Sequence, residues 1–365
     1  MKRTEIIAWL REDDPRRLEG LWRLAEAARQ VGVCDEVHLR GLLEISNHCV
    51  RDCFYCGLRK SNKGLQRYRM TADEVAAGAR QAAVFGYGTV VLQSGEDYGM
   101  RAGWLESVIR RIKRETPLAV TLGLGERPLA DLVTWRKAGA DRYLLRFETS
   151  NRALYDRLHP PLPGRRSDRL AMLKRLRKLG YETGGGVMVG IPGQTYDDLA
   201  GDIETFRELD LDMIGVGPYL AHPATPLGSE AATFAAPAGE QAPATELMTY
   251  KMVALARLVC PQANIPSTTA LATLSRAGRA LGLARGANVV MPNLTPPAYR
   301  RLYEIYPGKA CLAETAEACR TCLEKQILKL GRKIGSGPGA SPRGGKAKGA
   351  VPFSRFCEKG TVPFA

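Results

Sequence analysis

Residues 37–56 read VHLRGLLEISNHCVRDCFYC. The first half is an apolar, β-rich run, and the second half holds three cysteines, Cys49, Cys53 and Cys56. This pattern predicts a buried strand over 37–45 and, directly after it, a loop whose thiols bind metal or carry redox chemistry. Short runs of the same kind alternate with helical patterns along the rest of the chain, so this strand is the first of a series.

Seven further strand candidates follow: TVVLQSG (89–95), LAVTLGLG (118–125), DRYLLRFE (141–148), GGGVMVG (184–190), DMIGVGPYL (212–220), NIPSTTA (264–270) and ANVVMP (287–292). Helical patterns follow the strands, at about 72–85, 102–114, 128–138, 167–179, 195–208, 245–259, 271–282 and 297–305. Eight alternations predict a parallel α/β sheet, and their number favours a closed (β/α)8 TIM barrel over an open sheet. In such barrels the chemistry lies at the carboxyl ends of the strands.

The chain divides into four predicted regions. A helical pattern over 5–30 gives an N-terminal helical extension, residues 1–35, before the barrel at 36–310. A C-terminal cysteine-containing segment occupies 311–330. The tail, 331–365, is rich in Gly, Ser and Pro and has seven basic residues and one acidic residue, so we expect it to be disordered.

Composition narrows the function classes. The 365 residues are 45% hydrophobic and 25% charged with a net charge of +15, values compatible with a globular core. Nucleic acid is not an expected partner, because the basic tail lacks interleaved stacking aromatics. No apolar run approaches the ~18 residues that cross a membrane, so we expect a cytoplasmic protein without a membrane partner. Six of the nine cysteines fall into two clusters, which favours reduced, metal-binding thiols over a disulfide framework.

The first cluster has the spacing C-x3-C-x2-C. A structural zinc site normally has a fourth Cys or His nearby, and the adjacent His48 is poorly placed for that role. Three thiolates suit a 4Fe-4S cluster in which one iron keeps an open position for an external ligand. Zinc binding and simple thiol redox chemistry are the alternatives.

This spacing, with the aromatic Tyr55 before the last cysteine and at the end of the first barrel strand, resembles the radical S-adenosylmethionine (SAM) superfamily. The resemblance implies that Cys49, Cys53 and Cys56 ligate a catalytic 4Fe-4S cluster. It also implies that SAM is cleaved reductively to a 5'-deoxyadenosyl radical. Tyr55 would pack near the adenine, and the strand end Ser94-Gly95-Glu96 would meet the methionyl amino group.

Longer segments resemble the HydE family of FeFe-hydrogenase maturases from about residue 35 to 330. They are ISNHCVRDCFYCGLRKSN, RYRMTADEV, VVLQSGED, GADRYLLRFETSN, GYETGGGVMVGIPGQT, IGVGPYLAHPATPL, NIPSTTA, GANVVMPNLTP and YPGKAC. The resemblance implies that Glu148 binds the ribose hydroxyls and that Arg169 pairs with the methionyl carboxylate. From the residues alone, Glu148 would cap the next helix and Arg169 would be a solvated charge.

The same resemblance implies a substrate cavity lined by Gln93, Thr121, Arg142, Arg146, Thr268, Thr269 and Tyr303. The implied function is maturation of the hydrogenase H-cluster, with a cysteine-bound iron carbonyl cyanide precursor or another amino-acid-derived molecule as substrate. Other hydrogenase maturases and an electron donor such as ferredoxin or flavodoxin are the implied partners. Positive charge at the barrel mouth is compatible with an anionic substrate.

The second cluster, C-x7-C-x2-C, comprises Cys311, Cys319 and Cys322. It resembles the accessory iron-sulfur site of some members of this family, which implies a second cluster, 2Fe-2S or 4Fe-4S, outside the radical chemistry. Zinc is the alternative.

Three other functions remain to be weighed. A biotin-synthase-like sulfur inserter needs a second cluster held by strand cysteines inside the barrel, and no strand candidate contains Cys. A methylornithine-synthase-like mutase needs only an amino-acid cavity. A non-enzymatic iron-sulfur carrier or scaffold would not require the residues expected to bind SAM.

Overall fold

The structure is a computed structural model, and it describes residues 1–234, 236–312 and 314–344. The strands are β1 Glu36–Ser46, β2 Thr89–Ser94, β3 Ala119–Gly123, β4 Arg142–Leu144, β5 Glu182–Val189, β6 Met213–Pro218, β7 Val289–Val290 and β8 Lys333–Ile334. The helices are α1 Arg3–Arg11, α2 Pro15–Val33, α3 Ala72–Val84, α4 Ala102–Glu115, α5 Leu129–Ala138, α6 Arg152–Leu158, α7 Arg169–Lys178, α8 Tyr196–Glu208, α9 Pro226–Ser229, α10 Glu246–Val259, α11 Thr269–Leu274, α12 Gly278–Leu283, α13 Pro297–Arg300 and α14 Ala316–Lys329.

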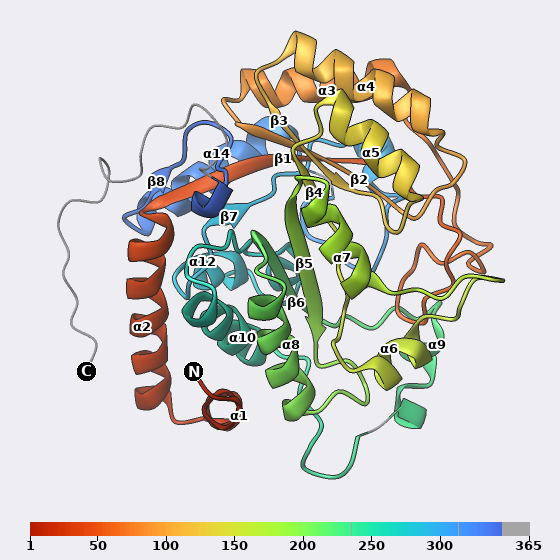
Figure 1. Cartoon of the computed structure of the whole chain (residues 1–365). Coiled ribbons are helices and arrows are strands. Elements are labelled where there is room, and N and C mark those ends of the chain that lie inside the picture. The colour runs from red at the N-terminus through yellow and green to blue at the C-terminus, as the bar shows by residue number, and fades with distance from the viewer. Residues whose placement is uncertain (235, 313, 345–365) are drawn as a thin grey trace.

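The strands form a parallel, curled sheet in the order β6-β5-β4-β3-β2-β1-β7 (Figure 1). The predicted strand at 264–270 makes only two isolated bridges, from Asn264 to Met213 and from Pro266 to Val289. These bridges connect β6 to β7 and complete a ring of eight segments. The predicted TIM-barrel class is therefore confirmed, with one of its eight strands reduced to bridges.

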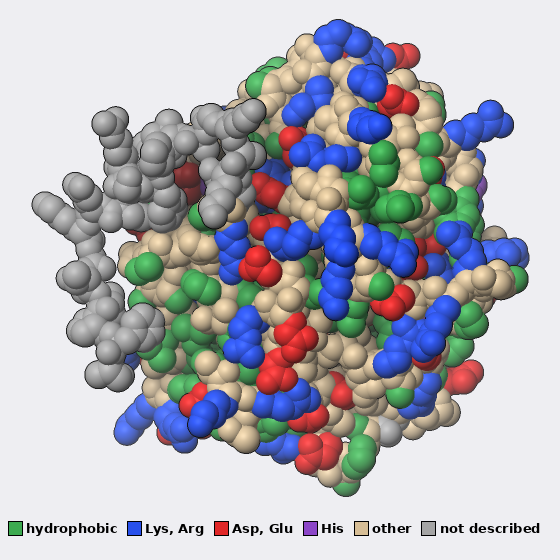
Figure 2. Space-filling view, viewed as in Figure 1, with side chains coloured by type: hydrophobic (Ala, Val, Ile, Leu, Met, Phe, Trp, Pro, Cys, Tyr) green, Lys and Arg blue, Asp and Glu red, His purple; other side chains and the backbone are tan. Residues whose placement is uncertain are grey.

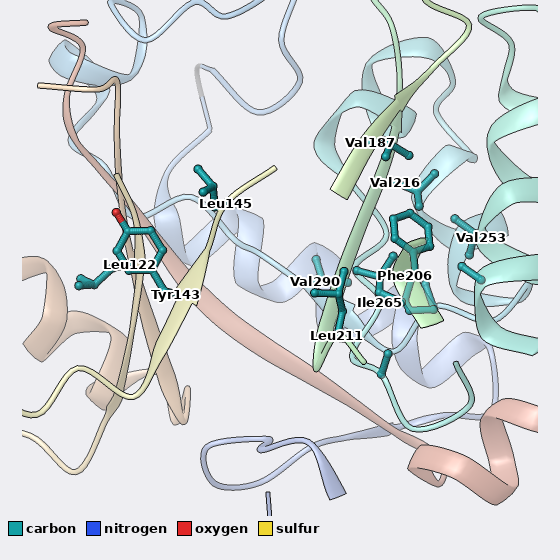
Figure 3. Packing of buried hydrophobic residues seen from close by; sticks show 14 of the residues in the cluster. Leu122, Tyr143, Leu145, Val187, Phe206, Leu211, Val216, Val253, Ile265 and Val290 are labelled. Carbon is teal, nitrogen blue, oxygen red and sulfur yellow. The ribbon is translucent and has the colours of Figure 1, made fainter. Parts of the chain in front are cut away.

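Helices cover the outer face of this sheet, as the right-handed crossovers of parallel strands require. Figure 3 shows Val187 of β5 and Val216 of β6 packed beside Phe206 of α8 and Val253 of α10. All four side chains are fully buried. This outer core holds the strands in place and leaves their inward residues to line the barrel interior. None of the described helices is long and apolar enough to cross a membrane.

Some predicted helices differ from the observed ones. The pattern at 5–30 forms two helices, α1 and α2, because Pro15 starts α2 and the Asp14 side chain caps it by accepting from Arg16 N. The pattern at 271–282 is divided into α11 and α12, and that at 297–305 shortens to α13.

The prediction of disorder from residue 331 is wrong for 331–344. β8 pairs with β1, and the Arg332 guanidinium, buried in the fold, donates to the carbonyls of Leu283 and Ala287. The Pro338 carbonyl accepts from Thr89 Oγ1 at 2.9 Å, at the start of β2. The composition of this segment could not predict its ordered structure, because that structure depends on hydrogen bonds to residues far away in the chain. The rest of the predicted tail, 345–365, lies outside the described residues.

Candidate functional site

The cysteine loop follows β1 at the carboxyl edge of the barrel. Three backbone bonds fix it: Val50 N donates to Glu96 O at 2.9 Å, Phe54 N to Leu158 O at 3.0 Å, and Gly57 N to Ile305 O at 2.9 Å. Glu96 follows β2 and Ile305 follows α13 along the chain, and Leu158 is the last residue of α6. The loop therefore takes its shape from three other parts of the fold, and each of them reaches the same edge.

The donor set of this loop suits a cluster better than a single ion. Cys49, Cys53 and Cys56 are all free thiols, and Cys53 is 7% exposed. Their three sulfurs do not all lie within 4.8 Å of one another, so they are not gathered around one point as the donors to a single ion would be. Burial, together with the neighbouring Cys49, raises the pKa of Cys53 to about 12, so metal binding must displace a proton.

The Ser94-Gly95-Glu96 strand end lies against the cysteine loop. A side chain at Gly95 would place its Cβ 2.3 Å from His48 O and 2.9 Å from Cys49 Cβ. Glu96 N lies 3.4 Å from Cys49 Sγ and donates to it. Glycine is therefore required at residue 95 by the close approach of two backbones.

A buried network of charges supports the loop from outside. Arg51 Nε donates to Glu96 Oε1 at 2.9 Å, and its Nη2 lies 3.1 Å from Glu126 Oε1. The same Glu126 oxygen accepts from Arg169 Nε at 3.3 Å and from the Ser167 hydroxyl. Glu126 therefore joins the arginine of the cysteine loop to the predicted SAM-binding Arg169.

Glu148 is not a helix cap and Arg169 is not a solvated charge, although their sequence context alone suggests these roles. Asn151, not Glu148, caps α6. Glu148 has a φ of 64°, a left-handed conformation that costs a residue with a side chain about 1–3 kcal/mol, and it is buried beside Arg146 at 3.1 Å. Arg169 is not solvated either, since its Nη1 donates to Arg146 O at 2.7 Å.

Tyr55 is held by a histidine that sequence analysis left without a role. His159 Nδ1 lies 2.8 Å from Tyr155 O, a carbonyl that can only accept, so this nitrogen carries the proton. Nε2 is then free to accept from the Tyr55 hydroxyl at 2.8 Å. Burial and the nearby Arg169 charge lower the pKa of His159 well below its usual range, which keeps the ring neutral. Its ring also stacks on Tyr155 at 4.0 Å.

Several residues predicted to line the substrate cavity have buried or mutually hydrogen-bonded polar groups. Gln93 Nε2 lies 3.4 Å from the Tyr303 hydroxyl. Thr121 Oγ1 and Thr268 Oγ1 are buried and make no hydrogen bond with the described residues. Thr269 begins α11 directly after Thr268. Such buried hydroxyls are suited to binding a polar ligand, because an unpaired buried polar atom is costly.

The structure does not bring Arg142 to this edge. It lies at the amino end of the barrel, where its guanidinium donates to Glu182 Oε2 at 2.5 Å, Thr89 Oγ1 at 2.9 Å and Pro338 O at 3.0 Å. Arg142 begins β4, whereas the site lies where the strands end. Its expected place among the cavity residues is therefore not supported, whereas Arg146, four residues further on, does lie beside Glu148.

An ion pair that sequence analysis missed lies between β1 and the segment before the second cysteine cluster. Lys309 Nζ donates to Glu44, and Asn293 Nδ2 donates to the other oxygen of the same carboxylate at 3.0 Å. Lys309 also lies 5.2 Å from the centre of the Tyr303 ring. Glu44 interrupts an apolar strand pattern, which was the one available signal.

The second cysteine cluster is only partly assembled. Among the described residues, Cys311, Glu314 and Cys319 form the one group of three His, Cys, Asp or Glu donors lying within 4.8 Å of one another. A hydrogen bond from Cys319 lowers the pKa of Cys311 to about 7. Cys322 lies one turn further along α14, is exposed, and accepts from Gln326 Nε2 at 3.4 Å. The structure thus adds Glu314 to the predicted set and leaves Cys322 outside the group.

Comparison with known proteins places this site in a family. The radical SAM superfamily description matches residues 43–206. The [FeFe] hydrogenase maturase subunit HydE of Thermotoga maritima is 47% identical over 325 residues, which cover 89% of each chain. The chain belongs to the HydE family.

Two solved structures share the fold of this HydE-family protein. Methylornithine synthase has a TM-score of 0.76 at 23% identity, covering 92% of this chain and 94% of that one. The hydrogenase maturase HydG has a TM-score of 0.73 at 18% identity, covering 91% of this chain and 71% of that one. The HydE-family protein is a radical SAM enzyme, and its superfamily uses a 4Fe-4S cluster and SAM.

Proposed function

We propose that this enzyme matures the H-cluster of FeFe hydrogenase by radical chemistry on a cysteine-bound iron carbonyl cyanide precursor or another amino-acid-derived substrate. One combined observation supports the proposal. The chain has the three-cysteine loop, and it is 47% identical to HydE of Thermotoga maritima over 89% of its length. The relative is a hydrogenase maturase, and we extend this role to the present chain. Other hydrogenase maturases and a one-electron donor are its proposed partners.

The proposed roles follow the geometry of the carboxyl edge. Cys49, Cys53 and Cys56 hold the cluster, which with SAM supplies the 5'-deoxyadenosyl radical. Arg169 binds the methionyl carboxylate, and Glu148 binds the ribose hydroxyls. Arg169 begins α7 and Glu148 follows β4, so both side chains would reach a ligand bound at the cysteine loop.

The strand end after β2 has a second role beside the ligand. Ser94 and Gly95 meet the methionyl amino group, and the Glu96 carboxylate orients Arg51 of the cysteine loop. Gly95 lets the strand end pack directly against the cysteine loop. Water is excluded from the reacting centre by the same close packing.

The substrate is proposed to lie deeper in the barrel. The hydroxyls of Thr121, Thr268, Thr269 and Tyr303, the Gln93 amide and the Arg146 guanidinium would bind its cyanide and carboxylate groups. The unpaired Thr121 and Thr268 hydroxyls support this placement, because a ligand would complete their hydrogen bonding.

The competing enzyme function is that of methylornithine synthase, whose fold this chain shares. The second cysteine cluster favours the maturase, because a mutase on an amino acid has no use for it. The named strands contain no cysteine, which argues against a sulfur inserter.

The maturase proposal is tested by omission. An anaerobic in vitro maturation mixture that contains the other maturases, a reductant and hydrogenase lacking the two-iron part of its H-cluster is expected to stay inactive without this chain. Adding the reconstituted chain is expected to restore hydrogen evolution. Full activation in its absence would refute the maturase role and leave SAM cleavage to be explained by another substrate.

His159→Phe is expected to raise the Kd for SAM several-fold, because the Tyr55 hydroxyl loses its buried acceptor at a cost of about 1–3 kcal/mol. The maximal rate of SAM cleavage at saturating SAM should change less. SAM affinity measured by calorimetry, with cleavage rates, gives both values.

The matched control combines His159→Phe with Tyr55→Phe. The second substitution removes the Tyr55 hydroxyl itself. In that background, His159→Phe should add little to the loss of affinity. Additive losses would show that His159 acts on the packing of α6 and not through Tyr55.

We also propose that Cys311, Cys319 and Cys322 hold an accessory iron-sulfur cluster. Cys319 and Cys322 lie three residues apart on α14, so they share one face of the helix. Glu314 adds an oxygen donor beside Cys311 and Cys319.

Cys319→Ser is expected to lower the iron content while sparing SAM cleavage, because the cysteine loop holds its own cluster. Metal analysis and 5'-deoxyadenosine release check the two parts. Bound zinc with unchanged iron would replace the iron-sulfur assignment with a zinc site. Loss of cleavage would show that the second site supports the radical chemistry.

A further inference from the structure

The segment after the last cysteine of the loop is strongly basic. Residues 57–69, GLRKSNKGLQRYR, carry five basic residues and no acidic residue. We call these five the basic collar: Arg59, Lys60, Lys63, Arg67 and Arg69. Lys60 and Lys63 are exposed. In Figure 2, Lys and Arg side chains occur along the right-hand edge, where Figure 1 places the segment between β1 and α3.

The basic collar is hydrogen-bonded to the cysteine loop itself. Arg59 N donates to Cys56 O at 3.1 Å, and Lys60 N donates to Arg51 O at 2.8 Å. Asn62 Nδ2 donates to Gly57 O at 2.7 Å. The backbone of the basic collar is therefore fixed beside the cysteine loop.

Most of this charge has no acidic partner. Two collar residues pair with carboxylates, Arg59 with Asp52 and Arg69 with Asp97. Arg67 donates only to backbone carbonyls, and within the described parts of the chain Lys60 and Lys63 form no ion pair. Three positive charges remain uncompensated next to the loop.

We propose that the basic collar docks a small acidic electron-carrier protein that reduces the cluster. This inference rests on the proposed function, which requires one electron for each SAM cleaved. The reduced carrier loses one electron and the cluster gains it, with no atom or proton transferred between the proteins. A brief encounter through a small, charged interface suits electron transfer, and complementary charge raises the association rate about 10- to 1,000-fold.

The test compares two reductants on the reconstituted enzyme. The double variant Lys60→Glu/Lys63→Glu reverses two exposed collar charges without touching a cluster ligand or a proposed SAM contact. Stopped-flow absorbance follows cluster reduction by a photoreduced acidic flavodoxin at low ionic strength. The variant is expected to be reduced at least tenfold more slowly than the parent enzyme, and the same rate with dithionite is expected for both, because the small reductant needs no docking.

The matched control is Lys325→Glu/Lys329→Glu, which makes the same charge change at exposed positions on α14. This control should keep the parent rate with flavodoxin. Calorimetry with the metal-free protein provides a second readout, in which the collar variant alone loses flavodoxin binding and added salt weakens binding by the parent.

Three outcomes would overturn the proposal. They are parent-like reduction of the collar variant by flavodoxin, an equal slowing with dithionite, and a loss of RNA binding by the collar variant while flavodoxin reduction is unchanged. Failure of the maturase role is distinguishable, because collar-dependent reduction does not need the maturation substrate. A chain that fails to support maturation but keeps that reduction would refute the proposed function alone.

Discussion

Cys53→Ser is expected to reduce the release of 5'-deoxyadenosine to background. Cys53 is the most buried of the three loop cysteines, and a serine oxygen is a poor substitute for thiolate in an iron-sulfur cluster. If the three cysteines hold the cluster as proposed, the loss of one ligand would remove the cluster and the electron that it supplies for SAM cleavage. Anaerobically reconstituted protein, incubated with dithionite and SAM and assayed by chromatography, checks this result together with iron content.

Cys260→Ala is the control for Cys53→Ser, because Cys260 is also buried but lies after α10, apart from both cysteine clusters. It should keep cluster content and cleavage. Cleavage that persists in Cys53→Ser would contradict the assignment of the loop. A cluster-loaded parent that never cleaves SAM would instead favour an iron-sulfur carrier.

Glu126→Gln is expected to lower the free energy of unfolding of the metal-free protein by about 3 kcal/mol. The Glu126 carboxylate lies between Arg51 and Arg169 and is the one carboxylate paired with Arg169 among the described residues. Without it, the Arg169 guanidinium stays buried with no opposite charge. Urea unfolding followed by circular dichroism measures the change in the midpoint.

The control for Glu126→Gln is Glu115→Gln, at the exposed end of α4, where Glu115 pairs with Arg80 and Arg111. Ion pairs in solvent are worth about 0–1 kcal/mol, so the control should unfold nearly as the parent does. Equal effects of the two substitutions would show that the buried network contributes no more than a surface pair. Since the metal-free protein is used, the result does not depend on cluster loading.

The order of the barrel was predictable because its signal is local. Apolar runs such as VHLRGLLEI are typical of strands that are buried on both faces. The helical patterns between these runs indicate that the strands are parallel and joined by helices. The predicted strand at 264–270 was harder, because it is held by only two isolated bridges and its assignment depends on β6 and β7. The folded part of the tail was not predictable, because Arg332 is ordered by carbonyls some 45 residues away in the chain.

Part of the site was also local in sequence. The cysteine spacing and Tyr55 lie within eight residues, and Gly95 belongs to a strand end that could be recognised. His159 gave no such signal, since it acts on Tyr55 across 104 positions. Lys309 is 265 positions from Glu44, and the local sequence around either residue does not indicate that the two form a pair. Arg142 was assigned to the substrate cavity but lies at the amino end of the barrel. Its place on a strand did not reveal at which end of the barrel its side chain lies.

By itself, the sequence determined the succession of strands and helices, the positions of both cysteine clusters in the chain and membership of the HydE family. These depend on residue type and short spacing, which the chain carries directly. Only the tertiary structure decided that Glu126 joins two arginines, that Cys322 stands apart from Cys311 and Cys319, and that the basic collar is held against the cysteine loop. Each of these depends on backbone and side-chain contacts between separate loops, because desolvation and pairing of charge are set by distances that exist only after the barrel has closed.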